Sequence, residues 1–138
     1  MDKYFDLIDQ TFYFPTEEFK LIDNELHFNG VPLMDVINKF GTPLKLSYLP
    51  KISSQIQKAK QLFNLAITEN NYQGNYTYCY CTKSSHFSFV LEEALKNDIH
   101  IETSSAYDIP IVRILFEKNK ITKQTNIICN GYKRHEYT

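Results

Sequence analysis

The sequence predicts an α/β protein in which helices cover a parallel sheet, with a short β segment in front of it. From Pro50 onward, segments whose apolar residues recur at helical spacing alternate with short runs of aromatic, β-branched and small residues. Glycines and polar residues separate these segments, and the order is helix, strand, helix, strand, helix, strand. This alternation is typical of a doubly wound sheet or of part of a (β/α) barrel, and periodicity alone does not separate the two.

The N-terminal part of the chain has shorter signals. Residues 11–14 (Thr-Phe-Tyr-Phe) predict a short strand, which Pro15 limits because proline cannot donate to a ladder. Residues 25–31 alternate polar and apolar side chains, and the Asn-Gly pair at 29–30 is a tight-turn signal before residues 31–33. We therefore expect a short hairpin here.

A short helix is predicted next. Residues 35–40 have helical period for one or two turns, and Gly41 followed by Pro43 is the order expected where a helix ends. We place a domain boundary at this point. Residues 1–40 are predicted to form an N-terminal β and irregular segment, and residues 41–138 the α/β domain.

The α/β domain begins with a long helix from Pro50. Its apolar face consists of Ile52, Ile56, Ala59, Phe63, Ala66 and Ile67. Asn70, Asn71 and Gly74 break this helix. Residues 76–82 then alternate aromatic with small side chains, which predicts a strand with both faces buried.

Two further pairs of helix and strand follow. The second helix has an apolar face of Phe87, Val90, Leu91, Ala94 and Leu95, and residues 99–103 predict the second strand. The third helix opens on a capping box at residues 105–108 and extends through Leu115. Pro110 predicts a local kink because it has no amide hydrogen. Residues 125–130 predict a third buried strand.

Composition excludes several classes of function. The chain has 138 residues, 43% of them hydrophobic, and 15 basic against 16 acidic residues give a net charge of −1. Balanced charge provides no electrostatic surface for nucleic acid or an anionic membrane. No apolar run approaches the roughly 18 residues of a membrane helix, and the N-terminus lacks a secretion signal. We expect a cytoplasmic protein with reduced cysteines and a small molecule or another protein as partner.

Polar residues follow each of the three predicted strands, namely Lys83, Glu102 and Asn130. They are the candidate site residues, because ligands of both architectures bind at the carboxyl ends of the strands. Lys83 shares a strand face with Cys79 and Cys81, which are small enough for a barrel interior, and would point inward. A lysine amine that loses its hydration in an apolar pocket can form a Schiff base with an aldehyde. The other interpretation is a lysine with its ammonium in solvent.

The cysteines allow a metal site to be considered. Cys79 and Cys81 could be combined with Cys129 or His100 as zinc ligands. Their spacing does not fit the usual turn-borne ligand pairs, so we interpret the cysteines as small core residues and predict no metal.

Five short motifs occur in an order that resembles one enzyme family. Residues 80–83 (Tyr-Cys-Thr-Lys) resemble the Tyr-x-x-Lys strand end of fold-type III pyridoxal-phosphate-dependent decarboxylases. Residues 30–33 (Gly-Val-Pro-Leu) and 41–44 (Gly-Thr-Pro-Leu) resemble the sequence that leads into the first barrel helix of that family. Residues 101–105 (Ile-Glu-Thr-Ser-Ser) resemble its second strand end. Residues 128–133 (Ile-Cys-Asn-Gly-Tyr-Lys) are similar to a segment of the biosynthetic arginine decarboxylases.

The resemblance implies a fold, a cofactor and a reaction. The fold would be the first part of a (β/α)8 barrel of the alanine racemase-like type, and Lys83 would be the lysine that binds pyridoxal 5'-phosphate. Glu102 matches an acidic residue near the cofactor and would act in catalysis. Asp108 matches a second acid, for which a capping role is equally open. The reaction would be decarboxylation of a basic amino acid, arginine to agmatine in polyamine biosynthesis, by a homo-oligomer.

The sequence departs from the family at Ser85, where asparagine is usual, and at Ala106, where lysine is common. The alternatives are another fold-type III enzyme, such as a diaminopimelate or ornithine decarboxylase or a racemase, and a non-catalytic homologue that binds pyridoxal phosphate. A complete barrel takes about 250 residues, so we expect the chain to be an inactive fragment. The phosphate-binding glycine loop and the acid that pairs with the pyridine nitrogen would follow Thr138.

Overall fold

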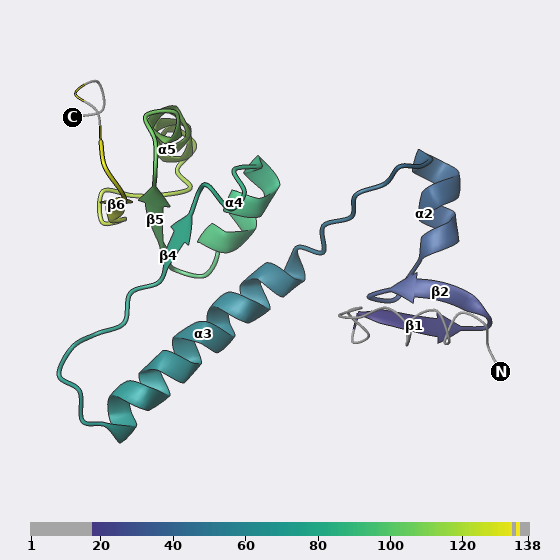
Figure 1. The fold of residues 1–138 in the computed structure, drawn as a ribbon, viewed down its shortest axis with the longest axis horizontal. Coiled ribbons are helices and arrows are strands. Elements are labelled where there is room, and N and C mark those ends of the chain that lie inside the picture. Colours follow the sequence, from purple (N-terminus) through teal and green to yellow (C-terminus); the bar gives the residue numbers. More distant parts are fainter. Residues whose placement is uncertain (1–17, 134, 136–138) are drawn as a thin grey trace. The chain divides into compact units, whose positions relative to one another are not determined.

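The chain forms two compact units, residues 1–48 and 49–138, in the computed structural model, which describes residues 18–133 and 135 (Figure 1). The predicted strand at residues 11–14 lies outside the described residues. The domain boundary that we predicted after residue 40 precedes the division between the units, because the segment after α2, up to Tyr48, groups with the first unit.

The first unit contains a small antiparallel sheet and one helix. Its elements are β1 (Phe19–Ile22), β2 (Glu25–Phe28), β3 (Val31–Pro32) and α2 (Leu33–Phe40), and the strands are neighbours in chain order. Each turn has two left-handed residues, with φ of 50° and 63° at Asp23 and Asn24, and 50° and 80° at Asn29 and Gly30. Tight hairpin turns require this conformation. The predicted hairpin of β2 and β3 is confirmed, whereas β1 is a strand that the sequence did not predict.

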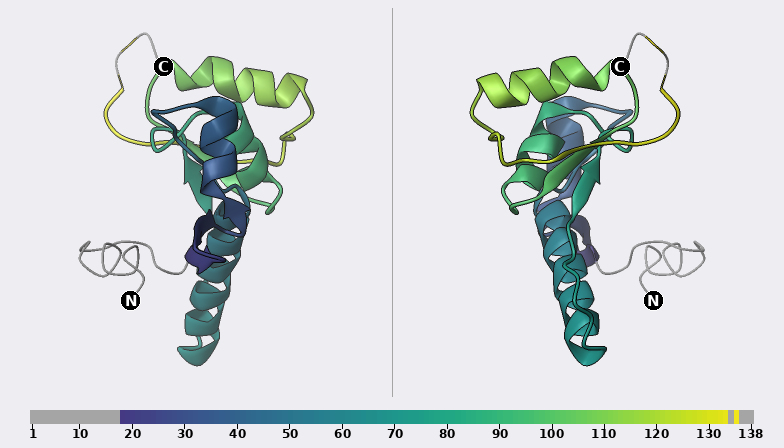
Figure 2. Two further views of the ribbon diagram at one scale, coloured as in Figure 1. Left: turned by 90° about the vertical axis from the view of Figure 1, so that its right-hand side faces the viewer. Right: turned by 90° about the vertical axis from the view of Figure 1, so that its left-hand side faces the viewer.

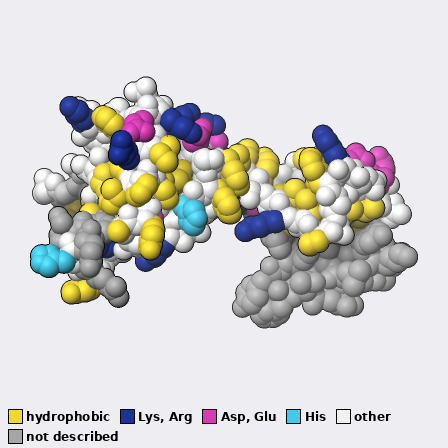
Figure 3. Space-filling view, turned by 90° about the horizontal axis from the view of Figure 1, so that it is seen from above, with side chains coloured by type: hydrophobic (Ala, Val, Ile, Leu, Met, Phe, Trp, Pro, Cys, Tyr) yellow, Lys and Arg dark blue, Asp and Glu magenta, His cyan; other side chains and the backbone are white. Residues whose placement is uncertain are grey.

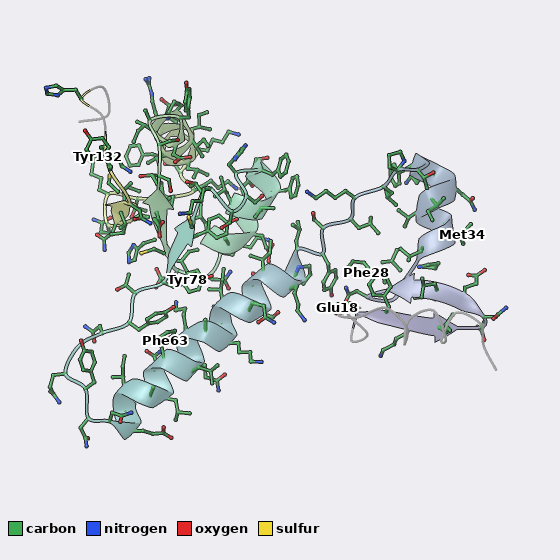
Figure 4. The ribbon with its side chains drawn as sticks, viewed as in Figure 1. Glu18, Phe28, Met34, Phe63, Tyr78 and Tyr132 are labelled. Carbon is green, nitrogen blue, oxygen red and sulfur yellow. The ribbon has the colours of Figure 1, made fainter. Side chains whose placement is uncertain are left out.

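The end of α2 and the packing of the first unit follow from a few residues. Gly41 has a left-handed φ of 77°, and its amide donates to the Ile37 carbonyl at 2.7 Å, so the helix ends where predicted. The Phe28 ring lies 5.0 Å from the Phe19 ring and 6.2 Å from the Tyr48 ring (Figure 4). These aromatic contacts form the centre of the small unit.

The second unit contains a parallel three-stranded sheet. Its elements are α3 (Pro50–Glu69), β4 (Cys79–Cys81), α4 (Ser88–Leu95), β5 (His100–Thr103), α5 (Asp108–Glu117) and β6 (Ile127–Cys129). The strand order is β4-β5-β6, and both pairings are parallel. The predicted alternation of helices and strands and the parallel sheet are confirmed.

The apolar core lies on one face of this sheet. Tyr80, Ile101 and Ile127 are register partners across the three strands, and side chains of α4 and α5 pack against them. A second cluster joins α3 to α4 and also packs against Tyr80. The buried members of the two clusters are Ile56, Leu91, Ala94, Ile99, Ile101, Leu115 and Ile121. We call this side of the sheet the covered face.

The opposite side, which we call the open face, has a different composition. Cys81, Glu102 and Ile128 are register partners there. Ile128 is 45% exposed on this face, and both clusters of buried apolar residues lie on the other.

Two details of the predicted strands were wrong. β4 has three residues rather than seven, because the Tyr76 ring leaves the sheet and stacks on Phe63 of α3 at 4.1 Å. β6 is not fully buried, since Ile128 and Cys129 are exposed at the edge of the sheet. α5 includes Pro110 in its first turn, where an amide would have no partner within the helix, and the local kink expected there stays a prediction.

The apolar face predicted for α3 is buried only in its first half. Ile56 is 2% exposed, whereas Phe63 is 52% exposed. Figures 1 and 2 show that the C-terminal half of α3 extends beyond the sheet, where the segment leading to β4 runs back alongside it. Phe63 and Tyr78 lie on the side of this returning segment (Figure 4).

Hydrophobic side chains are also exposed over α4 and α5 (Figure 3). They include Phe87, Phe89, Ile109, Ile114 and Phe116. Among the residues that the structure describes, no helix is both long and apolar enough to cross a membrane.

Candidate functional site

The three residues predicted from the strand ends are brought to one edge of the parallel sheet. Lys83 is the second residue after β4, Glu102 lies in β5, and Asn130 directly follows β6. Carboxyl ends of parallel strands meet at one edge, which is the reason for this arrangement. Figure 1 shows the three strands pointing toward the same side of the unit.

Lys83 sits in a turn whose backbone is well held. The amide of Thr82, which is fully buried, donates to the Glu102 carbonyl at 3.1 Å, and the Ser84 amide donates to the Cys81 carbonyl at 3.1 Å. The Lys83 side chain itself is exposed. The described residues therefore do not enclose it in the apolar pocket that the sequence predicted, and its positive charge contributes to lowering the pKa of Glu102.

Glu102 receives donors from both neighbouring strand ends. The Asn130 amide nitrogen Nδ2 donates to its Oε1 at 2.7 Å, and the Cys81 thiol donates to the same oxygen at 3.4 Å. The Asn130 hydrogen bond, followed by that of Cys81, lowers the pKa of Glu102, and the positive charges of Lys83 and Lys133 act in the same direction. The carboxylate is therefore stabilised in its ionised form.

The segment after β6 folds over the end of β5. The Asn130 backbone amide donates to the Thr103 carbonyl at 2.9 Å, which extends the parallel ladder by one bond. The Lys133 ammonium donates to the carbonyl of Ser104 at 3.0 Å and also to that of Asn130. These bonds place Lys133 at the edge of the candidate site. Tyr132, in contrast, is 94% exposed and lies near the C-terminal end of the described chain (Figure 4).

Asp108 lies next to this edge and has a structural role there. One carboxylate oxygen accepts hydrogen bonds from the backbone amides of Ser104 and Ser105, at 2.8 Å and 2.9 Å, and Thr82 also bonds to this carboxylate. Burial alone would raise the pKa of Asp108, but these hydrogen bonds outweigh it and the pKa lies below its usual value. The Ser105 amide bonds to Asp108 as in a capping box, but α5 begins only at Asp108 and its N-cap Tyr107 makes no side-chain cap hydrogen bond, so the helix does not open at residue 105 as predicted. Asp108 thus fixes the loop between β5 and α5.

The cysteines do not meet at one point. Cys79 is on the face of Glu102, and burial, followed by the Glu102 charge, raises the pKa of its thiol. Cys129 pairs in register with Thr103, and its sulfur lies 3.9 Å from the Thr103 hydroxyl on the covered side. None of the three cysteines forms a disulfide bond. Within residues 18–133 and 135, no group of three His, Cys, Asp or Glu side chains could hold a metal ion.

Comparison with known proteins gives two similar sequences. The chain is 29% identical over 117 residues to the biosynthetic arginine decarboxylase of Marinobacter nauticus, and 26% identical over 100 residues to that of Alkalilimnicola ehrlichii. These alignments cover 78% and 70% of this chain but only 16% and 15% of the relatives. No protein-family profile matches the chain. The similarity supports the resemblance drawn from the five motifs, at low identity and over a small part of each relative.

Two contacts of the candidate site were difficult to predict from the sequence. Cys81 was interpreted only as a small core residue, yet its thiol contacts the candidate acid. Cys81 lies two positions before Lys83, and alternate residues of a strand share a face. This spacing could have indicated that Cys81 belongs to the site. The contact between Asn130 and Glu102 depends on strand register, which a single sequence does not specify.

Proposed function

We propose that this chain is part of a pyridoxal-phosphate-dependent amino-acid decarboxylase, that Lys83 holds the cofactor, and that the substrate is arginine. The observation that carries the proposal is the exposed Lys83 amine at the same carboxyl edge of a parallel sheet as the Glu102 carboxylate, whose pKa the lysine charge helps to lower. The names of the two relatives support arginine as the substrate.

The residues at this edge fit the aldehyde end of the cofactor. An accessible primary amine is the group that forms a C=N bond with an aldehyde carbon, and the aldehyde oxygen leaves as water. Glu102 provides a negative charge at the same sheet edge, and its hydrogen bonds favour its ionised form. When bound, pyridoxal phosphate supplies an electron sink for the bond that breaks in decarboxylation.

The chain's own residues would prepare the site before any ligand binds. Thr82 and Ser84 fix the turn that carries Lys83, and Asp108 fixes the loop that follows Glu102. Lys133 ties the segment after β6 to the end of β5. Such preorganisation reduces the reorganisation that binding and reaction would otherwise require.

The two faces of the sheet support the proposal that the fold is part of a (β/α)8 barrel. In a barrel, helices cover only the outer face and the inner face holds the site. Here the apolar clusters occupy one face, while Glu102 and its partners Cys81 and Asn130 occupy the other. A doubly wound sheet would need an apolar surface on both faces.

The test uses visible absorption and substrate turnover. We expect pyridoxal phosphate added to the full-length protein to give the visible band of a lysine-bound cofactor, and Lys83→Ala to abolish that band. Lys123→Ala, which removes an exposed lysine between α5 and β6, is the matched control and should leave the band unchanged. An unchanged spectrum in the Lys83→Ala variant would refute the assignment.

Release of labelled carbon dioxide decides the substrate. We expect the full-length protein to release it from arginine faster than from ornithine, lysine or diaminopimelate, and residues 1–138 alone to release none. Faster release from one of the other amino acids would instead indicate a decarboxylase of that amino acid. A bound cofactor without release from any of them would indicate a non-catalytic homologue.

A further inference from the structure

We propose that Asn130 is a positioning residue, which together with Cys81 holds one carboxylate oxygen of Glu102 and thereby keeps a negative charge at the sheet edge that carries Lys83. This inference rests on the proposed function of Lys83. It gives a role to Asn130, in addition to the roles proposed for Glu102 and Lys83.

The geometry at Glu102 is asymmetric. Oε1 accepts both the 2.7 Å hydrogen bond from Asn130 and the 3.4 Å hydrogen bond from Cys81. The Glu102 carboxylate has no other hydrogen bond among the residues that the structure describes, so Oε2 is left for a ligand. A carboxylate held through one oxygen has a defined orientation, because two donors from opposite sides fix its plane.

Asn130 is itself held in place on both sides. Its backbone amide bonds to Thr103, and its carbonyl accepts from Lys133. Gly131, with a left-handed φ of 78°, turns the chain directly after it. The side-chain amide is therefore anchored by the backbone over the end of β5, which is the property that a positioning residue needs.

Four titratable groups act on Glu102 from the surrounding elements. Cys79 and Cys81 approach from β4, Lys83 from the turn after β4, and Lys133 from the segment after β6. The two lysines favour the ionised carboxylate, and Asn130 does so without adding a charge of its own. A neutral donor leaves the Glu102 carboxylate its full negative charge, and a negative charge near the nitrogen of a lysine-bound cofactor would favour the protonated form of that nitrogen.

The experiment measures two pH titrations of the full-length protein. Carbon-13 NMR of the cofactor-free protein follows the Glu102 carboxyl, and the visible band with pyridoxal phosphate follows proton loss at the Lys83 nitrogen. In Asn130→Ala we expect the pKa of Glu102 to rise and the midpoint of the band titration to fall, each by roughly half a unit to one unit. Glu102→Gln should lower the same midpoint.

The double variant tests whether Asn130 acts through Glu102. If it does, Asn130→Ala adds no further shift to the midpoint in the Glu102→Gln background. If Asn130→Ala does not fold, Asn130→Asp can be used instead, because it keeps the shape of the side chain. Asn130→Asp should raise the pKa of Glu102 by repulsion but should not lower the band midpoint. Asn126→Asp makes the same chemical change just before β6 and serves as the control.

The outcomes separate the two proposals. Absence of a lysine-bound band in the unaltered protein would overturn the proposed function. A normal band with an unchanged midpoint in Asn130→Ala, or an additional shift in the double variant, would overturn the role of Asn130 and leave that of Lys83 standing.

Discussion

The two faces of the parallel sheet are built from the same three strands but have opposite properties. On the covered face, Ile101 is fully buried among side chains of α4 and α5. On the open face, the next residue, Glu102, is partly exposed and bonds to Asn130 and Cys81. Because side chains alternate along a strand, one short segment supplies both a core residue and a site residue. Stability and chemistry can therefore be changed separately.

The largest expected effect is on the covered face. Ile101→Ala removes a side chain that is 0% exposed and should lower the free energy of unfolding by about 2–5 kcal/mol. Ile128→Ala, in the next strand on the open face, should cost less than about 1 kcal/mol. Urea unfolding followed by circular dichroism measures both. Equal losses in the two variants would contradict the division into a covered and an open face.

An intermediate effect is expected at Asp108, on the covered side of the sheet edge. Asp108→Asn weakens the hydrogen bonds to the amides of Ser104 and Ser105 and should cost about 1–3 kcal/mol. Since the pKa of Asp108 is lowered by folding, its stabilisation is present above the ordinary aspartate pKa and is lost as the pH falls through the lower folded value.

The pH dependence of unfolding tests this sign. The unaltered chain should lose stability on acidification below about pH 4, and Asp108→Asn should show a smaller loss over the same range. A variant whose acid-induced loss equals that of the unaltered chain would show that another carboxylate is responsible.

The smallest effect on stability is expected on the open face. Glu102→Gln keeps the shape of a partly exposed side chain and should change the free energy of unfolding by less than about 1 kcal/mol. The same variant should shift the pH titration of the visible band formed with pyridoxal phosphate, because it removes the negative charge of Glu102. Thermal unfolding together with that titration checks both parts. A large stability loss without a change in the titration would make Glu102 a structural residue.

Local sequence patterns predicted most of the second unit but not its long-range contacts. The apolar period identified α3, and the alternation around Cys79 and Cys81 identified β4. The excess length predicted for β4 has a physical cause, since Tyr76 stacks on Phe63 instead of continuing the sheet. β1 was not predicted because a four-residue strand has too little period to be recognised without its partner.

The candidate site shows the same limit. Lys83, Glu102 and Asn130 could be named from their positions after predicted strands. The bond between Asn130 and Glu102, and the use of Asp108 as a loop anchor, depend on which strands are neighbours and on how loops turn. These relations require the folded chain, because residues far apart in sequence must meet.

We propose that Lys83 is the residue that binds pyridoxal phosphate, and borohydride trapping can show this on the residue itself. The protein is incubated with pyridoxal phosphate, reduced with borohydride, digested and analysed by mass spectrometry of all lysine peptides. We predict that the reduced adduct forms predominantly on Lys83, and that exposed lysines such as Lys123 remain largely unmodified. An adduct spread evenly over the exposed lysines, or absent from Lys83, would contradict the claim.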